Sequence, residues 1–212
     1  MATTQPIRSK KEVRKLAAYY LDLGQHRNHV LIVLGVHTAL RVSDLLRMCW
    51  DDVYDFDNDR VLTTIELVEN KTGKSKTIAL NEAAIRALSL YAAESAARGR
   101  FLMENPNTGN AISRIQAYRI IRGASEALKL ENRASCHSLR KTFGYHSWKN
   151  GVSPVIIMDI YNHSSLAVTQ RYLGVTQDDK NAAYLSLSFD EESDYSHDMY
   201  TNTPHRALQD LF

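Results

Sequence analysis

The hydrophobic pattern of this chain of 212 residues switches period in one region, and the switch limits the folds open to the chain. Through most of the chain, apolar residues recur every three to four positions, which is typical of amphipathic helices. Apolar and polar residues alternate instead in 61–68 and 76–80, on either side of the turn sequence Asn70-Lys-Thr-Gly73. The sequence therefore predicts a mainly α fold with one small antiparallel β-sheet, an α+β protein.

Capping residues and apolar stretches locate the expected helices. Ser9 and Glu12 form a capping box before the first apolar repeat. The stretch 30–36 is almost wholly apolar, so its helix is expected at the centre of the core. We expect helices at about 9–21, 27–38, 41–48, 81–97, 113–128, 138–150, 154–161 and 177–186, with a further helix carrying Tyr172.

Composition narrows the class of protein. The hydrophobic content of 44% and the charged content of 24% are those of an ordinary soluble protein. No apolar run reaches the roughly 20 residues that a membrane span needs, and the first residues lack the apolar core of a signal peptide. The two cysteines, Cys49 and Cys136, are expected to be reduced thiols. The sequence indicates a cytoplasmic protein of one domain, with an acidic, weakly ordered tail over 191–212.

Charge is distributed unevenly although the net charge is only +2. Residues 8–15 carry five positive charges and one negative charge, whereas residues 190–198 carry five negative charges. A basic body with an acidic tail is the polarity expected of a protein that binds DNA on one face. A solvated helix face explains the basic run equally well, and a solvated chain end is the simpler explanation of the acidic one.

Four residues that suit phosphodiester chemistry lie within 36 positions: His137, Arg140, His163 and Tyr172. A guanidinium can bind phosphate with two parallel hydrogen bonds. Imidazoles transfer protons near neutral pH, and a phenol can attack phosphorus to form a covalent intermediate. Upstream, Arg41 supplies a second guanidinium, and Lys71 lies on the predicted hairpin.

In chain order, these positions resemble the active-site signature of the tyrosine recombinase (phage integrase) family. The resemblance extends from about residue 9 to residue 186. It implies the tyrosine recombinase catalytic-domain fold over residues 1–190 and six catalytic residues, Arg41, Lys71, His137, Arg140, His163 and Tyr172.

The resemblance also implies the reaction. Tyr172 would attack a DNA phosphate, leaving a 3′-phosphotyrosine and a free 5′ hydroxyl, with His137 as the base. Arg41 and Arg140 would clamp the phosphate, and Lys71 would protonate the departing 5′ oxygen. The phosphoester bond is conserved in the covalent link, so neither a cofactor nor a metal is expected.

Several of these assignments have alternatives in the sequence. Lys74 or Lys76 could take the place of Lys71 on the hairpin. Asn162 precedes His163 where the family more often has glycine, but asparagine tolerates the same left-handed conformation. Lys141, His146 and Trp148 are interpreted as structural. A metal site is not supported, because no H-x-x-x-H pair or carboxylate partner accompanies His137 or His163.

The family implies double-stranded DNA as the partner, a homotetramer on DNA, and accessory DNA-bending proteins as further partners. Only about eight residues precede the first predicted helix, so we expect no N-terminal core-binding domain. That leaves either an excised catalytic domain or a short stand-alone recombinase similar to the fimbrial phase-variation recombinases. Two other functions are open: a type IB topoisomerase, which shares the chemistry but only relaxes DNA, and a non-catalytic DNA-binding regulator on the same fold.

Overall fold

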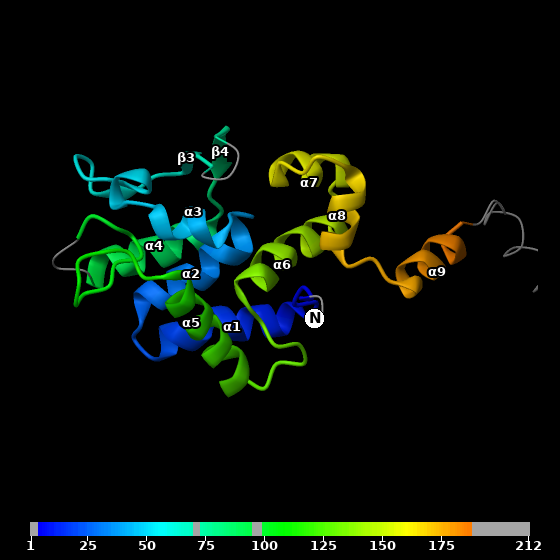
Figure 1. The fold of residues 1–212 in the computed structure, drawn as a ribbon, viewed down its shortest axis with the longest axis horizontal. Helices are drawn as coiled ribbons and strands as arrows, with labels where there is room; N and C mark the ends of the chain where they lie inside the picture. Colours follow the sequence, from blue (N-terminus) through cyan, green and yellow to red (C-terminus); the bar gives the residue numbers. More distant parts are fainter. Residues whose placement is uncertain (1–3, 70–72, 95–98, 188–212) are drawn as a thin grey trace, which may run out of the picture. The chain divides into compact units, whose positions relative to one another are not determined.

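A computed structural model describes residues 4–69, 73–94 and 99–187 of the chain. It is mainly helical, as the sequence predicts, with short antiparallel strands between the third and fourth helices (Figure 1). The helices are α1 (Lys10–Asp22), α2 (His26–His37), α3 (Val42–Arg47), the 3₁₀ turn η1 (Trp50–Asp52), α4 (Glu82–Glu94), α5 (Arg114–Ala127), α6 (Cys136–Lys149), α7 (Pro154–Tyr161), α8 (Leu166–Leu173) and α9 (Gln177–Leu185).

Helix α2 lies at the centre of the core, where its apolar sequence predicts it. Every residue from Asn28 to Val36 is buried. The helix packs against α1, α4 and α6 on different sides, so an apolar surface all round is what its position demands. Ser9 caps α1, because its Oγ accepts a hydrogen bond from the Glu12 amide, but the predicted capping box is incomplete, since the Glu12 carboxylate accepts from the Glu131 amide instead.

The strands form two small sheets, whereas the sequence predicts one. β1 (Tyr54–Asp55) pairs with β2 (Arg60–Val61), and β3 (Thr64–Val68) pairs with β4 (Ser75–Ala79). The predicted strand 61–68 is therefore wrong as a single element. Its first residue belongs to the β1–β2 ribbon, and Leu62 and Thr63 connect the two ribbons. Alternation alone could not reveal the break, because period two continues across it.

Helices α6, α7 and α8 pack together around a second, smaller core of Ala39, Ile157, Tyr161 and Leu173 (Figure 1). The predicted Ser153-Pro154 start of α7 is confirmed, with Ser153 Oγ accepting from the Val155 amide. Gly144 lets α6 approach the Tyr161 ring so closely that a Cβ at that position would collide with the phenol hydroxyl.

Residues 4–8, here called the N-terminal segment, are bonded to α6 and to the end of α8. The Ile7 amide donates to Thr142 Oγ1 at 2.9 Å, and Lys141 Nζ donates to the Thr4 carbonyl at 2.6 Å. Arg8 Nη2 donates to the Gly174 carbonyl at 2.9 Å. The segment therefore supports two helices that carry predicted site residues.

The chain divides into two compact units, residues 1–174 and 175–212. Within the second unit the structure shows α9, close to the predicted helix 177–186, with a capping box formed by Thr176 and Asp179. The predicted tail 191–212 lies outside the described residues. Among the helices that the structure describes, none is both long and apolar enough to cross a membrane.

Candidate active site

Two of the predicted site residues, Arg41 and Arg140, converge on the C-terminal end of α7. Arg140 Nη2 donates to the Tyr161 carbonyl at 2.9 Å, and Arg41 Nη2 approaches the same oxygen at 3.4 Å. Lys76 Nζ donates to the preceding carbonyl, that of Ile160. Carbonyl groups at a helix C-terminus carry partial negative charge. They therefore hold three cations together that would otherwise repel one another.

Arg140 is the most buried of these cations, with 3% of its surface exposed. Its Nη1 donates to the Ala39 carbonyl, and its guanidinium lies 4.5 Å from the centre of the Tyr161 ring. Burial, followed by the positive charge of Arg41, lowers the pKa of Arg140. A guanidinium nevertheless remains charged in proteins, so the site keeps a fixed positive charge at any working pH.

Tyr172 lies on α8 among the remaining predicted residues. Its ring centre is 4.9 Å from that of His137 and 4.6 Å from that of His163. Lys141, one turn of α6 after His137, places Nζ 5.3 Å from the Tyr172 ring centre. The structure thus brings together five of the six predicted catalytic residues. Of the three residues interpreted as structural, Lys141 also reaches the site.

The sixth predicted residue, Lys71, lies outside the described residues. Lys76, a fallback for Lys71, lies in the cation cluster, with 11% of its side chain exposed. Burial, followed by the charge of Arg140, lowers the pKa of Lys76 to about 8. A group with that pKa can release a proton near neutral pH. Among the residues that the structure describes, Lys76 is therefore the alternative candidate for the role assigned to Lys71.

His163 is positioned by the end of α7. Asn162 caps that helix in the left-handed conformation, with φ 51°, as expected of a residue that replaces glycine there. His163 Nδ1 lies 3.0 Å from Thr169 Oγ1, a contact that orients the ring. Burial, then the charges of Arg140 and Arg41, lowers the pKa of His163 to about 4. His163 is therefore neutral at pH 7.

His137 lies in the first turn of α6, which begins at Cys136, ahead of the start of the predicted helix 138–150. Desolvation, and then the charges of Lys141 and Arg140, lowers the pKa of His137 below the ordinary value of 6.5. A neutral imidazole beside a phenol can accept the phenolic proton. The position and charge state of His137 both suit a general base.

Tyr161 is the other tyrosine near the cations, but it is unsuited to attack. It is fully buried, and its hydroxyl donates to the Arg140 carbonyl at 2.5 Å. Burial raises the pKa of Tyr161 far above the ordinary value. Its phenol therefore stays protonated and occupied, whereas Tyr172 is partly exposed to solvent.

Sequence reasoning missed Glu69 and gave Asn162 only a backbone role. Glu69 Oε2 forms an ion pair with Arg41 Nη1 at 2.8 Å and accepts a hydrogen bond from Asn162 Nδ2 at 2.9 Å. Both partners lie far from Glu69 in sequence, so no local spacing could reveal the contact.

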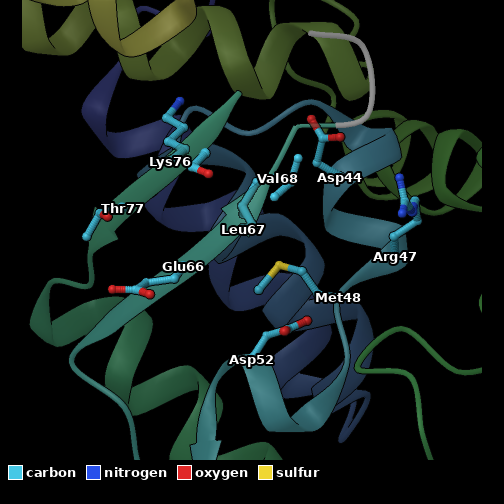
Figure 2. A pocket seen from close by; sticks show the side chains of 10 residues that line it. Asp44, Arg47, Met48, Asp52, Glu66, Leu67, Val68, Lys76 and Thr77 are labelled. Atoms are coloured by element: carbon cyan, nitrogen blue, oxygen red, sulfur yellow. The ribbon is translucent and has the colours of Figure 1, made fainter. Parts of the chain in front are cut away.

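A pocket of about 470 Å³ opens beside the cluster, between α3 and the β3–β4 ribbon. Figure 2 shows Lys76 and Asp44 at one end of this pocket and Asp52 at the other. Glu66 adds a third carboxylate to the lining. Arg47 and Lys76 supply two cations, so the lining of the pocket carries charges of both signs. Over the described part of the chain, no three histidine, cysteine, aspartate or glutamate side chains gather as a metal site would require.

The comparison with known families decides how this geometry is to be interpreted. The model of the phage integrase family matches residues 8–178. The chain belongs to the phage integrase family. As a member of this family of tyrosine recombinases, it is classed as a site-specific DNA recombinase, as the sequence predicts. The topoisomerase and the non-catalytic regulator are not favoured.

Curated relatives agree with this assignment. The chain is 35% identical over 184 residues to the probable integrase/recombinase YoeC of Bacillus subtilis, covering 87% of this chain and 97% of that protein. It is 25% identical to the tyrosine recombinase XerD of Corynebacterium glutamicum over 72% of this chain. The alignment covers 49% of that XerD, so the chain matches about half of the length of this longer relative.

Solved structures confirm the fold. XerA recombinase superposes with a TM-score of 0.69 at 22% identity, over 86% of this chain and 65% of that one. XerH bound to a palindromic difH substrate gives a TM-score of 0.69 at 18% identity, over 87% and 53% of the two chains. The predicted tyrosine recombinase catalytic-domain fold is thereby confirmed.

Proposed function

We propose that the protein cleaves and rejoins double-stranded DNA through a phosphotyrosine formed at Tyr172. The observation that carries the proposal is the meeting of Arg41 and Arg140 at one carbonyl, close to a tyrosine flanked by two neutral histidines. The XerH relative is described in a post-cleavage complex with its difH substrate, which supports DNA as the partner.

The role that we assign to each site residue follows from its charge. A phosphate under attack gains negative charge, and two fixed guanidiniums stabilise it more strongly than they stabilise the starting diester. His137 takes the proton from the Tyr172 hydroxyl while the phenolic oxygen bonds to phosphorus. The 5′ oxygen then leaves with a proton that we assign to Lys71. His163, being neutral, hydrogen-bonds the phosphate and needs no charge to do so.

Strand exchange between two duplexes requires four such sites, so the proposal includes a homotetramer on DNA, with accessory DNA-bending proteins as further partners, in the cytoplasm. A relation to the fimbrial phase-variation recombinases belongs to the same proposal. The match to YoeC, which covers 97% of that protein, supports only a relation to an integrase/recombinase of similar length.

A nicked suicide substrate carrying the native target tests the nucleophile. Tyr172→Phe should form no covalent adduct and should bind DNA with nearly unchanged affinity, because binding rests on phosphate contacts elsewhere. The control is Tyr184→Phe, which alters an exposed phenol on α9. A covalent adduct formed by Tyr172→Phe would refute the assignment.

The arginine clamp has its own test. Arg41→Lys and Arg140→Lys retain the charge but lose the planar fork, so each should slow cleavage by about 100-fold or more at saturating protein. Cleavage at the normal rate by both variants would exclude the clamp while leaving the family assignment intact.

A further inference from the structure

Glu69 directly follows strand β3 and is buried in a way that its neighbour is not. Its side chain has no exposed surface, whereas Val68 is 60% exposed. An exposed valine beside a buried carboxylate reverses the usual preference. Burying a carboxylate is costly unless charged or polar partners compensate for the lost hydration.

The partners of Glu69 come from separate parts of the fold. Arg41, the N-cap of α3, and Asn162, the C-cap of α7, both contact Oε2, at 2.8 and 2.9 Å. Lys76 on β4 places Nζ 3.8 Å from Oε1. A single carboxylate therefore links the hairpin, the start of α3 and the end of α7.

The charges explain why a carboxylate is needed at this point. Arg41, Arg140 and Lys76 converge on neighbouring carbonyls, and burial, followed by their mutual repulsion, lowers the pKa values of Arg140 and Lys76. The negative charge of Glu69 acts in the opposite direction on both groups. Glu69 thus offsets part of the repulsion while leaving the cluster with an excess of positive charge for a phosphate.

We propose that Glu69 is a positioning residue for DNA strand cleavage, which holds the Arg41 guanidinium in place with Asn162 as its second support. Glu69 touches no reacting atom in this role. It acts by orienting Arg41, whose hydrogen bond to the Tyr161 carbonyl is long, at 3.4 Å, and therefore weak without help. The inference rests on the proposed role of Arg41 in the clamp.

The test combines a variant of Glu69 with variants of its partners, using the full chain and the nicked suicide substrate. Glu69→Gln keeps the shape and loses the charge, so cleavage at saturating protein should slow by about 10- to 100-fold, the effect expected of a misplaced catalytic group. In an Arg41→Lys background the same change should add little further loss, because both changes remove one function. Glu66→Gln changes an exposed glutamate on β3, the strand just before Glu69; it is the matched control and should cleave normally.

A second variant keeps the test independent of the folding of Glu69→Gln. Asn162→Gly preserves the left-handed backbone and removes the side chain whose amide donates to Glu69, so it should slow cleavage in the same non-additive way, by a smaller factor. Normal cleavage by Glu69→Gln would overturn the inference. So would a double variant, Glu69→Gln with Arg41→Lys, whose loss of cleavage rate equals the product of the two single losses. If Arg41→Lys itself cleaved normally, the proposed clamp would fail instead, so the two failures are distinguishable.

Discussion

At the scale of single residues, two tyrosines close to the same guanidinium have opposite environments. Tyr161 is enclosed in the small core between α6 and α8, and its hydroxyl is committed to the Arg140 carbonyl. Tyr172 is partly exposed and lies between two imidazoles. Burial thus favours Tyr172 as the nucleophile that we propose, since its phenol is partly exposed while that of Tyr161 is enclosed.

The proton donor to the 5′ oxygen can be identified with a substrate that does not need one. A 5′-thio leaving group departs as a thiolate, whose conjugate acid is far more acidic than an alcohol. Lys71→Ala should therefore cleave ordinary DNA very slowly, and its cleavage rate should be largely restored on the 5′-thio substrate. Lys76→Gln should be slow on both substrates, because Lys76 is held by the Ile160 carbonyl and contributes fixed charge.

Lys74→Ala, on the exposed part of the same hairpin, is the control and should reduce the cleavage rate only slightly with either substrate. Rescue of Lys76→Gln in place of Lys71→Ala would move the general acid to Lys76.

His163 offers a prediction about pH. Because its pKa is lowered to about 4 in the folded protein, the unfolded chain binds a proton between about pH 6.5 and pH 4 that the folded protein does not. The free energy of unfolding should fall as the pH drops through this window, and His163→Gln should reduce that slope. NMR titration of the imidazole measures the pKa directly. A value near 6.5 without DNA would contradict the prediction.

The site could be predicted from sequence only where chemistry and spacing coincide. Arg140 and His137 share a helical turn, and Tyr172 follows His163 at a short distance, so their types and order indicate a phosphodiester site. Glu69 carries no such signal. Its importance comes from burial against Arg41 and Asn162, which only the tertiary fold creates.

At the scale of elements, the contact between α6 and α7 depends on one missing methyl group. Gly144→Ala would force Cβ against the Tyr161 phenol, whose hydroxyl is bonded to the Arg140 carbonyl. Overpacking of this kind costs about 1–3 kcal/mol. We expect a lower melting temperature together with slower cleavage, since the displaced ring lies against Arg140.

Gly123→Ala on α5 is the control for this change. The nearest atom to its Cβ would be 3.8 Å away, and alanine favours a helix interior, so the melting temperature should not fall. Unchanged melting and cleavage in Gly144→Ala would show that α7 can move away without affecting the clamp.

The elements themselves were largely predictable, because helix ends carry local signals. Ser9 and Ser113 accept from the backbone where the sequence places helix starts, and Gly151 adopts φ 87° just after α6. The division of the strands into two ribbons was not predictable. It depends on which partner each strand finds, and residue 61 pairs with Tyr54 in place of a residue from β4.

At the scale of the whole molecule, the basic run over residues 8–15 contains side chains in different environments. Arg14 and Lys15 are exposed on α1, while Arg8 donates to the Gly174 carbonyl and lies 5.5 Å from the Tyr145 ring centre. Arg14→Ala/Lys15→Ala should weaken DNA binding and lower the slope of log affinity against log salt by roughly 0.9 for each phosphate that the variant no longer neutralises. Cleavage at saturating protein should remain normal. An unchanged salt slope would place DNA on another face.

The N-terminal segment has a consequence for anyone who handles this protein. Thr4, Ile7 and Arg8 are bonded to α6 and to the end of α8, the helices that carry Arg140 and Tyr172. An affinity tag or a fusion partner joined ahead of Thr4 is consequently held close to Lys141, whose Nζ lies 5.3 Å from the Tyr172 ring centre. A protease that trims past Arg8 removes part of the support of α6 and α8. A loss of activity after tag removal would then reflect the position at which the protease cut. Activities of different preparations are comparable only when their first residue is the same.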